Sequence, residues 1–239
     1  MAVQEVLILV GGLGSRLRGI VNGLPKPMAR VAERPFLEWL VLQARKKGIR
    51  KVIFCSGYLG TVIRNHFGDG ANYDVRCEYS QEPKPLGTGG ALRFARTIVE
   101  NELVLVLNGD SYCRYDIERL EKAQERFGSD VTLWLQKSDD CTRFGAVEVG
   151  NDGLVKALVE KPADMAGGLI NAGVYLMRTA FLDSIAENCF VSLEKDVLPT
   201  LIGNGLSGVI GEGPFIDIGT PESFRAASEF MELEESYQM

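Results

Sequence analysis

The sequence predicts one α/β domain, a Rossmann-like three-layer sandwich in which helices cover both faces of a mostly parallel, mixed sheet. Two observations predict this fold. Short apolar runs alternate with segments of helical periodicity up to about residue 138, and glycine or polar residues punctuate the boundaries. Such βαβ order is typical of parallel strands, because each crossover helix returns the chain to the same end of the sheet.

The elements of the first half follow in order. Val6–Val10 is a continuous apolar run, as expected for a strand buried on both faces. Pro35–Lys47 carries apolar residues at helical spacing along one face. The same reasoning predicts further strands at Lys51–Cys55, Asp74–Tyr79, Leu103–Leu107 and Val131–Leu135, and helices at Gly60–Phe67, Gly90–Val99 and Asp116–Phe127.

The second half is richer in β-structure. Gly145–Val149 and Leu154–Glu160 flank an Asn-Asp-Gly turn, which is a hairpin signal. Within the one domain we expect a ligand-binding first part over about residues 1–138 and a β-rich, substrate-binding second part over about residues 139–220. We also expect a solvated acidic tail after Glu229. The remaining expected elements are strands at Val174–Met177 and Phe215–Ile218, a helix at Asp196–Ile202, and a last helix at Pro221–Met231 that Thr220 caps with Ser223 in its first turn.

Composition narrows the class of protein. With a net charge of −6, the protein does not have the excess of positive charge that is typical of nucleic-acid-binding proteins. No apolar run approaches the ~20 residues that span a bilayer, and the N-terminal residues lack a signal-peptide pattern. Five cysteines, an odd number without CxxC spacing, indicate reduced thiols. We therefore expect a cytoplasmic protein without nucleic-acid or membrane partners.

Positive charge is nevertheless concentrated near the N-terminus. The stretch Val6–Ala32 contains no acid but four bases, namely Arg16, Arg18, Lys26 and Arg30. A basic loop on an acidic protein suggests a small anionic ligand, and a solvated basic surface is the alternative.

A glycine-rich turn, GGLGSRL, follows the first predicted strand. Gly11, Gly12 and Gly14 allow close approach of a phosphate to backbone N–H groups, beside Ser15, and Arg16 adds a fork for phosphate oxygens. The turn lacks the GxxxxGK[ST] of a Walker A loop and the third glycine of a dinucleotide-binding GxGxxG. A glycine turn without a ligand is the other reading.

The segment LPKPM follows shortly after. Two prolines fix the backbone on either side of Lys26 and position its ammonium group as a point charge for phosphate. A rigid surface loop is the alternative for this segment alone.

Together these motifs resemble the nucleotidyltransferases that make nucleotide sugars. The resemblance extends over nearly the whole chain in the order of that family, through LGTGGA (86–91), NGD (108–110), FG (144–145), EKP (160–162), NAGVY (171–175) and DIGTP (217–221). It implies the nucleotide-diphospho-sugar transferase fold and the transfer of a nucleoside monophosphate from an NTP to a sugar 1-phosphate. The first part, about residues 1–138, would then bind the nucleotide, and the second part, about residues 139–220, would bind the sugar.

The resemblance also implies the roles of particular residues. Asp110 ends an apolar strand at the edge where α/β sheets bind ligands, and with Asp217 it is implied to hold Mg²⁺, which suits carboxylates and phosphate oxygens. Arg16 and Lys26 are implied to be catalytic. The implied nucleotide-binding residues are Gly11, Gly12, Gly14, Ser15, Gln81, Gly87, Thr88, Gly89 and Asp110, and the implied sugar-phosphate-binding residues are Gly145, Glu160, Lys161 and Asn171.

The substrate pair is read from two stretches. YSQEPKPLGTGGAL and SLEKD most resemble the D-glycero-D-manno-heptose 1-phosphate guanylyltransferases, which implies GTP and a manno-configured heptose 1-phosphate. N-acetylmuramate 1-phosphate uridylyltransferases share most of the motifs, so a uridylyltransferase for N-acetylmuramate 1-phosphate or another hexose 1-phosphate is the alternative. A non-catalytic nucleotide-sugar sensor is the alternative of another class. We expect a monomer or homodimer.

Overall fold

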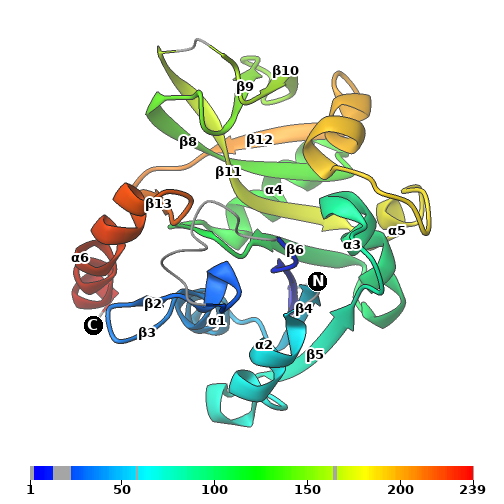
Figure 1. The fold of residues 1–239 in the computed structure, drawn as a ribbon. Coiled ribbons are helices and arrows are strands. Elements are labelled where there is room, and N and C mark those ends of the chain that lie inside the picture. The colour runs from blue at the N-terminus through cyan, green and yellow to red at the C-terminus, as the bar shows by residue number, and fades with distance from the viewer. Residues whose placement is uncertain (1–2, 13–22, 58, 164–165, 239) are drawn as a thin grey trace.

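The fold is described from a computed structural model, which covers residues 3–12, 23–57, 59–163 and 166–238 (Figure 1). Its strands are β1 (Glu5–Leu9), β2 (Arg30–Val31), β3 (Arg34–Pro35), β4 (Lys51–Ser56), β5 (Arg76–Gln81), β6 (Leu103–Asn108), β7 (Ser111–Cys113), β8 (Val131–Asp140), β9 (Gly145–Val149), β10 (Val155–Glu160), β11 (Ala166–Arg178), β12 (Leu206–Ile210) and β13 (Phe215–Asp217). Its α-helices are α1 (Phe36–Lys46), α2 (Gly60–Phe67), α3 (Gly87–Ala95), α4 (Ile117–Phe127), α5 (Thr179–Leu182) and α6 (Pro221–Gln238).

Within the described residues, nine strands form one sheet. Strands β5, β4, β1 and β6 are parallel neighbours in that order, and β11 pairs antiparallel with β6. Strand β11 also pairs with β8 and β9, so it joins the parallel part to the β9–β10 hairpin, which projects at the top of Figure 1. The prediction of a mostly parallel, mixed α/β sheet is confirmed.

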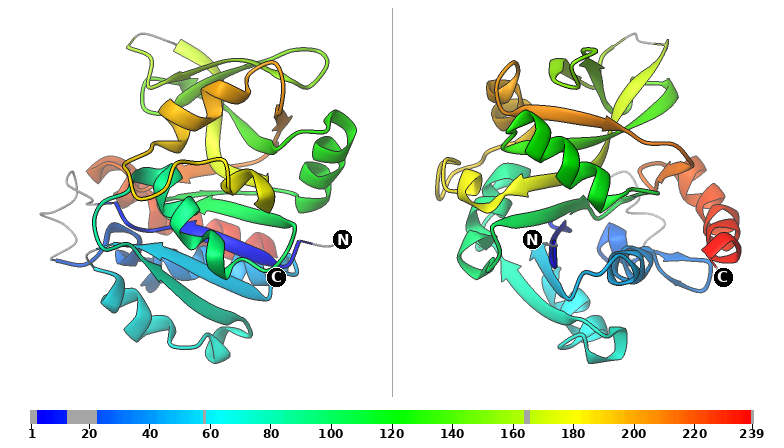
Figure 2. Two further views of the ribbon diagram at one scale, coloured as in Figure 1. Left: turned by 90° about the vertical axis from the view of Figure 1, so that its right-hand side faces the viewer. Right: turned by 180° about the vertical axis from the view of Figure 1, so that it is seen from behind.

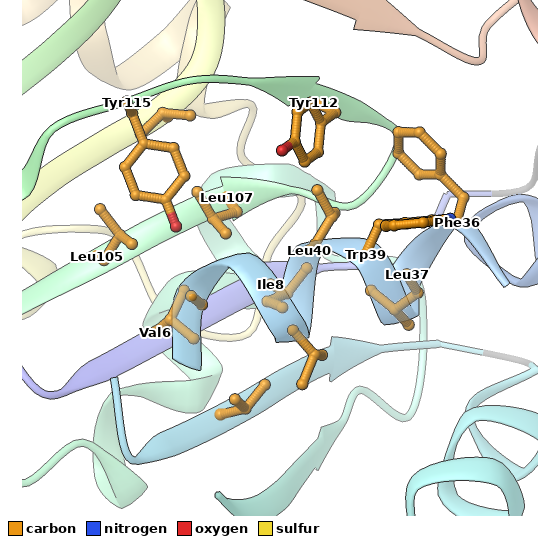
Figure 3. Close-up of a cluster of buried hydrophobic side chains, with 14 of the residues drawn as sticks. Val6, Ile8, Phe36, Leu37, Trp39, Leu40, Leu105, Leu107, Tyr112 and Tyr115 are labelled. Carbon is orange, nitrogen blue, oxygen red and sulfur yellow. The ribbon is translucent and has the colours of Figure 1, made fainter. Parts of the chain in front are cut away.

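Helices cover both faces of the sheet, as Figure 2 shows from two further sides. On one face, Val6 and Ile8 of β1 belong to one buried cluster with Phe36, Leu37 and Leu40 of α1, and Figure 3 shows these side chains in that cluster. Burial of each large apolar side chain contributes about 1.5–3 kcal/mol. On the other face, α3 and the segment after α5 pack on the alternate residues of the same strands.

Several predicted elements need correction. Strand β11 begins at Ala166, well before the expected Val174, and β12 lies in a segment to which no element was assigned. Where a helix was expected at Asp196–Ile202, the chain forms a π-helical turn, η5 (Leu193–Val197), and a 3₁₀ turn, η6 (Leu198–Leu201). Pro199 lacks the N–H that a continuing α-helix needs, and its ring opposes that helix.

The last helix is not merely a solvated tail. Helix α6 extends to Gln238, and the Thr220 hydroxyl accepts a hydrogen bond from Ser223 N at 3.2 Å, as predicted for its cap. Beyond Glu229, Glu234 is buried. Its two carboxylate oxygens accept hydrogen bonds from Nε and Nη2 of Arg114, each at 2.9 Å. The expectation of a solvated end is therefore wrong for Glu234.

The described residues also bear on the expectations about membrane spans and cysteines. None of their helices is long and apolar enough to cross a bilayer. All five cysteines are free thiols; Cys55, Cys77, Cys113 and Cys141 are buried and Cys189 is exposed. The division near residue 138 into two functional parts stays a prediction.

Candidate active site

A cavity of about 630 Å³ opens where the parallel strands end. Residues after the carboxyl ends of β1 and β6 line one end of it, and residues of β9, β10 and β11 line the other. The first turn of α3 and η5 close a further side. The cavity thus lies where open α/β sheets bind ligands, between the parallel strands and the hairpin.

Lys26 and Asp110 meet at the strand end. Pro25 precedes a 3₁₀ turn over Lys26–Met28, η2, which holds Lys26 over the end of β6. The Lys26 Nζ donates to Asp110 Oδ2 at 2.6 Å, although the two residues lie 84 positions apart. The Asp110 side chain is 40% exposed, so it remains open to a ligand in the cavity.

Asp217 lies beside Asp110 because two short strands pair. Asp217 of β13 is in register with Ser111 of β7, and Ile218 N donates to the backbone oxygen of Asp110 at 2.9 Å. The structure therefore joins the two acids whose proximity only the family resemblance implied.

Asp217 is the more buried of the two acids. Burial raises the pKa of its carboxyl; Arg143 and Lys26 oppose that rise and Asp110 adds to it. Arg143 donates to Asp217 Oδ1 at 2.5 Å. Each acid thus has one cation of the chain beside it. Two carboxylates at an open cavity fit a Mg²⁺ ion that takes its other ligands from phosphate and water.

The hairpin brings Gly145 and Glu160 to the opposite end. They are register partners in β9 and β10, and a Cβ at Gly145 would lie 3.0 Å from Glu160 Oε2, so a larger residue would displace that carboxylate. Lys161 has a φ of +50°, a left-handed conformation that costs an L-residue about 1–2 kcal/mol. Its Nζ lies 3.2 Å from Glu160 Oε1.

Asn171 and Tyr175 form the floor of this end. Asn171 Nδ2 donates to the Tyr175 hydroxyl at 2.9 Å, and its Oδ1 accepts from Gly173 N at 3.1 Å. Strand β11 changes register against β8 between Asn171 and Tyr175. Gly173 has a φ of +73° there, and a Cβ would lie 2.7 Å from Asn108 Nδ2. This irregularity turns both polar side chains into the cavity.

The first turn of α3 is held by a second segment. The N–H groups of Gly89 and Gly90 both donate to the Val191 carbonyl, at 2.9 and 3.2 Å. Gly87 has a φ of +73°, and a Cβ there would collide with the same carbonyl. The Gly89 amide is therefore already bonded within the chain.

Most predicted site residues that the structure describes share this one cavity. Gln81 and Gly89 are not among its lining residues; Gln81 is exposed at the end of β5. Gly14, Ser15 and Arg16 lie outside the described residues. The predicted residues that line the cavity are Gly11, Gly12, Lys26, Gly87, Thr88, Asp110, Gly145, Glu160, Lys161, Asn171 and Asp217.

Three further charged residues line the cavity without having been predicted as site residues. These are Glu82, Arg143 and Glu194. Glu82 directly follows Gln81, and Arg143 precedes the FG motif, so both lay beside residues already singled out. Their relevance needs contacts that sequence spacing does not show, such as the Arg143–Asp217 pair across 74 positions.

The cavity as a whole can hold a phosphate-rich ligand at one end and a hydroxyl-rich ligand at the other. The first end, which we call the phosphate end, holds Lys26, Asp110, Arg143 and Asp217, and the second end, which we call the sugar end, holds Gly145, Glu160, Lys161, Asn171 and Tyr175. Such an arrangement suits transfer of a phosphoryl-linked group between two bound substrates.

Comparison with known proteins gives this arrangement a context. A family model described as "Nucleotidyl transferase" matches residues 5–234. The D-glycero-alpha-D-manno-heptose 1-phosphate guanylyltransferase of Aneurinibacillus thermoaerophilus is 36% identical over 95% of this chain and 97% of its own. The mannose-1-phosphate guanylyltransferase of Mycobacterium tuberculosis is 35% identical over 94% of this chain, which spans 64% of that protein.

A solved structure shares the fold. HddC from Yersinia pseudotuberculosis is 30% identical and has a TM-score of 0.84, covering 95% of this chain and 99% of that one. The same protein has also been solved in complex with GMP-PN.

Proposed function

Because this chain belongs to the nucleotidyl transferase family, we propose that it transfers GMP from GTP to D-glycero-D-manno-heptose 1-phosphate. The products are GDP-heptose and pyrophosphate. The observation that carries the proposal is the single cavity in which Lys26 and Asp110 lie at one end and Glu160 and Asn171 at the other. The heptose 1-phosphate guanylyltransferase of Aneurinibacillus thermoaerophilus supports the choice of substrates, because its similarity to this chain covers 97% of its own length.

The chemistry needs no protein nucleophile. An oxygen of the sugar 1-phosphate attacks the α-phosphorus of GTP, the bond from that phosphorus to the β-phosphate oxygen breaks, and pyrophosphate leaves with the electron pair. The attacking phosphate is already ionised at neutral pH, so a general base is not required.

Repulsion between the substrates is the main barrier to their meeting. Two like charges 4 Å apart repel by ~1 kcal/mol in water and ~4 kcal/mol at an effective dielectric constant of 20. We assign Lys26 to the GTP phosphates and Lys161 to the sugar 1-phosphate, since both line the cavity. Arg16, outside the described residues, keeps its predicted catalytic role in this proposal.

We assign Asp110 and Asp217 to a Mg²⁺ ion. Their adjacent positions and the cations already beside them support this assignment. When bound, the ion supplies positive charge that stabilises the phosphate oxygens of the transition state. Lys26 and Arg143 lie beside the two carboxylates, from where both would also be able to donate to substrate oxygens.

The base and the sugar have competing candidates. Mannose 1-phosphate is the second candidate acceptor, because a mannose-1-phosphate guanylyltransferase is 35% identical over 94% of this chain. Guanine is favoured over uracil by two guanylyltransferase relatives and by the similar structure in complex with GMP-PN. A sensor without activity is disfavoured, since Lys26, Asp110 and Asp217 all line the cavity.

The decisive test is pyrophosphate release with Mg²⁺. Each of GTP, UTP, CTP, dTTP and ATP is combined with manno-heptose, mannose and N-acetylmuramate 1-phosphates. Release with GTP and the heptose alone supports the proposal. Release with GTP and mannose 1-phosphate instead would make mannose 1-phosphate the acceptor. Release with UTP and N-acetylmuramate 1-phosphate would change the assignment of both substrates. A folded protein that binds GDP-heptose but releases nothing with any pair is a sensor.

Assembly and location are part of the same proposal. We place the enzyme in the cytoplasm, where GTP is made, as a monomer or homodimer. Light scattering coupled to size-exclusion chromatography gives the mass against 26.2 kDa for one chain. A stable mass above twice that value contradicts the expected assembly.

A further inference from the structure

The turn η5 brings an unassigned carboxylate to the cavity. Residues 189–194 run beside the first turn of α3, where the Val191 carbonyl accepts from Gly89 and Gly90. Three residues later Glu194 lines the cavity. Short π-helical turns of this kind are uncommon and are frequent at functional sites.

Thr88 fixes one oxygen of this carboxylate. The Thr88 hydroxyl donates to Glu194 Oε2 at 2.8 Å and accepts from Leu193 N, also at 2.8 Å. The Ser192 hydroxyl donates to the same Oε2 at 3.2 Å. A hydroxyl has one hydrogen to donate. The hydroxyl hydrogen of Thr88 is donated to Glu194 within the chain, so it is not donated to a nucleotide.

The other oxygen of Glu194 remains available. Among the residues that the structure describes, none donates a hydrogen bond to its Oε1. A carboxylate oxygen that lines a cavity and lacks a donor suits a ligand hydroxyl, because charge-assisted hydrogen bonds of this kind are strong. Phosphate is excluded as its partner, since two anions repel.

Glu194 lines the same cavity as Glu160, the carboxylate already assigned to the sugar, and as Tyr175. Tyr175 is fully buried below the cavity, and its pKa is raised well above the ordinary value by burial first and then by Glu194, with Glu160 adding to the rise. The two carboxylates therefore act on the same phenol. Asn171 donates to that phenol at 2.9 Å and lines the same cavity.

We propose that Glu194 is a specificity-determining residue that accepts hydrogen bonds from hydroxyls of the sugar 1-phosphate, and that Thr88 is the positioning residue that holds it. The inference rests on the proposed function, but not on which sugar is used. It gives Thr88 a role different from nucleotide binding. It also links the first turn of α3 to the sugar end, because Thr88 belongs to that turn.

The test compares Glu194→Gln, Thr88→Val and Thr88→Ser with the wild type. We expect Glu194→Gln to raise the sugar KM by about 10- to 100-fold, as for loss of a charge-assisted hydrogen bond, with the GTP KM within about twofold. Thr88→Val raises the sugar KM by about 5- to 10-fold, and Thr88→Ser restores it. Glu148→Gln is the matched control, because Glu148 is exposed on β9 outside the cavity lining.

Direct contact is separated from a structural role by monodeoxy sugar 1-phosphates. With the analogue that lacks the bound hydroxyl, wild type and Glu194→Gln should have equal KM values. The inference is overturned if every analogue preserves the difference, or if the GTP KM alone changes. Wild type that makes no nucleotide sugar from any pair overturns the proposed function instead. Melting temperatures show which variants are folded.

Discussion

The two ends of the cavity are built from different strands and different side chains. The phosphate end lies beyond parallel strands, and its acids each face a cation, Lys26 beside Asp110 and Arg143 beside Asp217. The sugar end lies on antiparallel strands, and its polar groups bond to one another, as Asn171 does to Tyr175.

This difference predicts which kinetic constant each end controls. In the proposed reaction, charge at the phosphate end acts on the groups that change charge, so we expect it to affect the rate of the chemical step. Hydrogen-bonding groups at the sugar end would contact hydroxyls that do not react, so we expect them to affect binding. Substitutions at the two ends should therefore change different kinetic constants.

The largest effect is expected for Asp110→Asn. Loss of this carboxylate weakens the proposed metal site and removes the partner of Lys26, and kcat should fall on the order of 10²- to 10³-fold. Pyrophosphate release measures the rate, and circular dichroism checks the fold. Asp139→Asn, at an exposed position of β8, is the control. Turnover near that of the wild type in the folded variant would show that Asp110 holds no metal.

Lys26→Ala should be the next largest. The ammonium group offsets phosphate charge in the transition state, so kcat should fall by about 10²-fold with the sugar KM little changed. Steady-state kinetics with each substrate varied in turn give both constants, and Lys137→Ala at an exposed position is the control. A change in sugar KM alone would move Lys26 from the phosphate end to the sugar end.

Glu160→Gln should sharpen the contrast from the other side. Its carboxylate is 17% exposed and lies at the sugar end, so the variant should raise the sugar KM by about tenfold and leave kcat within about threefold. The same assays measure it. If kcat fell as far as in Asp110→Asn, the division of labour between the two ends would be wrong.

The smallest effect concerns stability at the phosphate end. Burial raises the pKa of Glu82 above its ordinary value of 4.5, although Leu86 N donates to it. The folded state then binds this proton more tightly than the unfolded state, so stability falls as pH rises from 4.5 through the raised pKa. The Glu82→Gln variant has no carboxyl at this position and does not lose stability in this way as pH rises. Its melting temperature should therefore be about 2 °C above that of the wild type at neutral pH and equal to it below pH 4.5. Parallel melting curves that stay equal at every pH would contradict this.

The sequence predicted the parallel half better than the antiparallel half for a physical reason. Strands buried on both faces are continuous apolar runs, and β1, β4 and β6 were each located within one residue or so. Helix α2 was predicted with its observed bounds, Gly60–Phe67. Strand β11 mixes glycine and polar residues with apolar ones where it crosses the cavity, so its first half shows no clear periodicity.

The site divides in the same way. Motifs carried by turns, such as LPKPM and NGD, mark Lys26 and Asp110 without any structure. Arg143 lies beside the FG motif and Glu194 within SLEKD, but neither motif indicates what these side chains do, because their partners, Asp217 and Thr88, are distant in the chain. Gln81 is the exposed last residue of β5, whereas Glu82, the first residue after that strand, lines the cavity, and the position of a motif in the sequence cannot separate two such neighbours.

The irregular register of β11 also limits where insertions and deletions can occur among proteins related to this chain. Four steps from Asn171 to Tyr175 correspond to two steps along β8. Deleting one residue there would reverse the side of the sheet that one of them faces. In the turn between β9 and β10, Asn151 and Asp152 are exposed, so insertions can be accepted there, whereas the Gly153 carbonyl already accepts a hydrogen bond from Gly208 N. Evolution of the sugar pocket should therefore proceed by substitution within β11, whereas length polymorphism should gather at the hairpin tip.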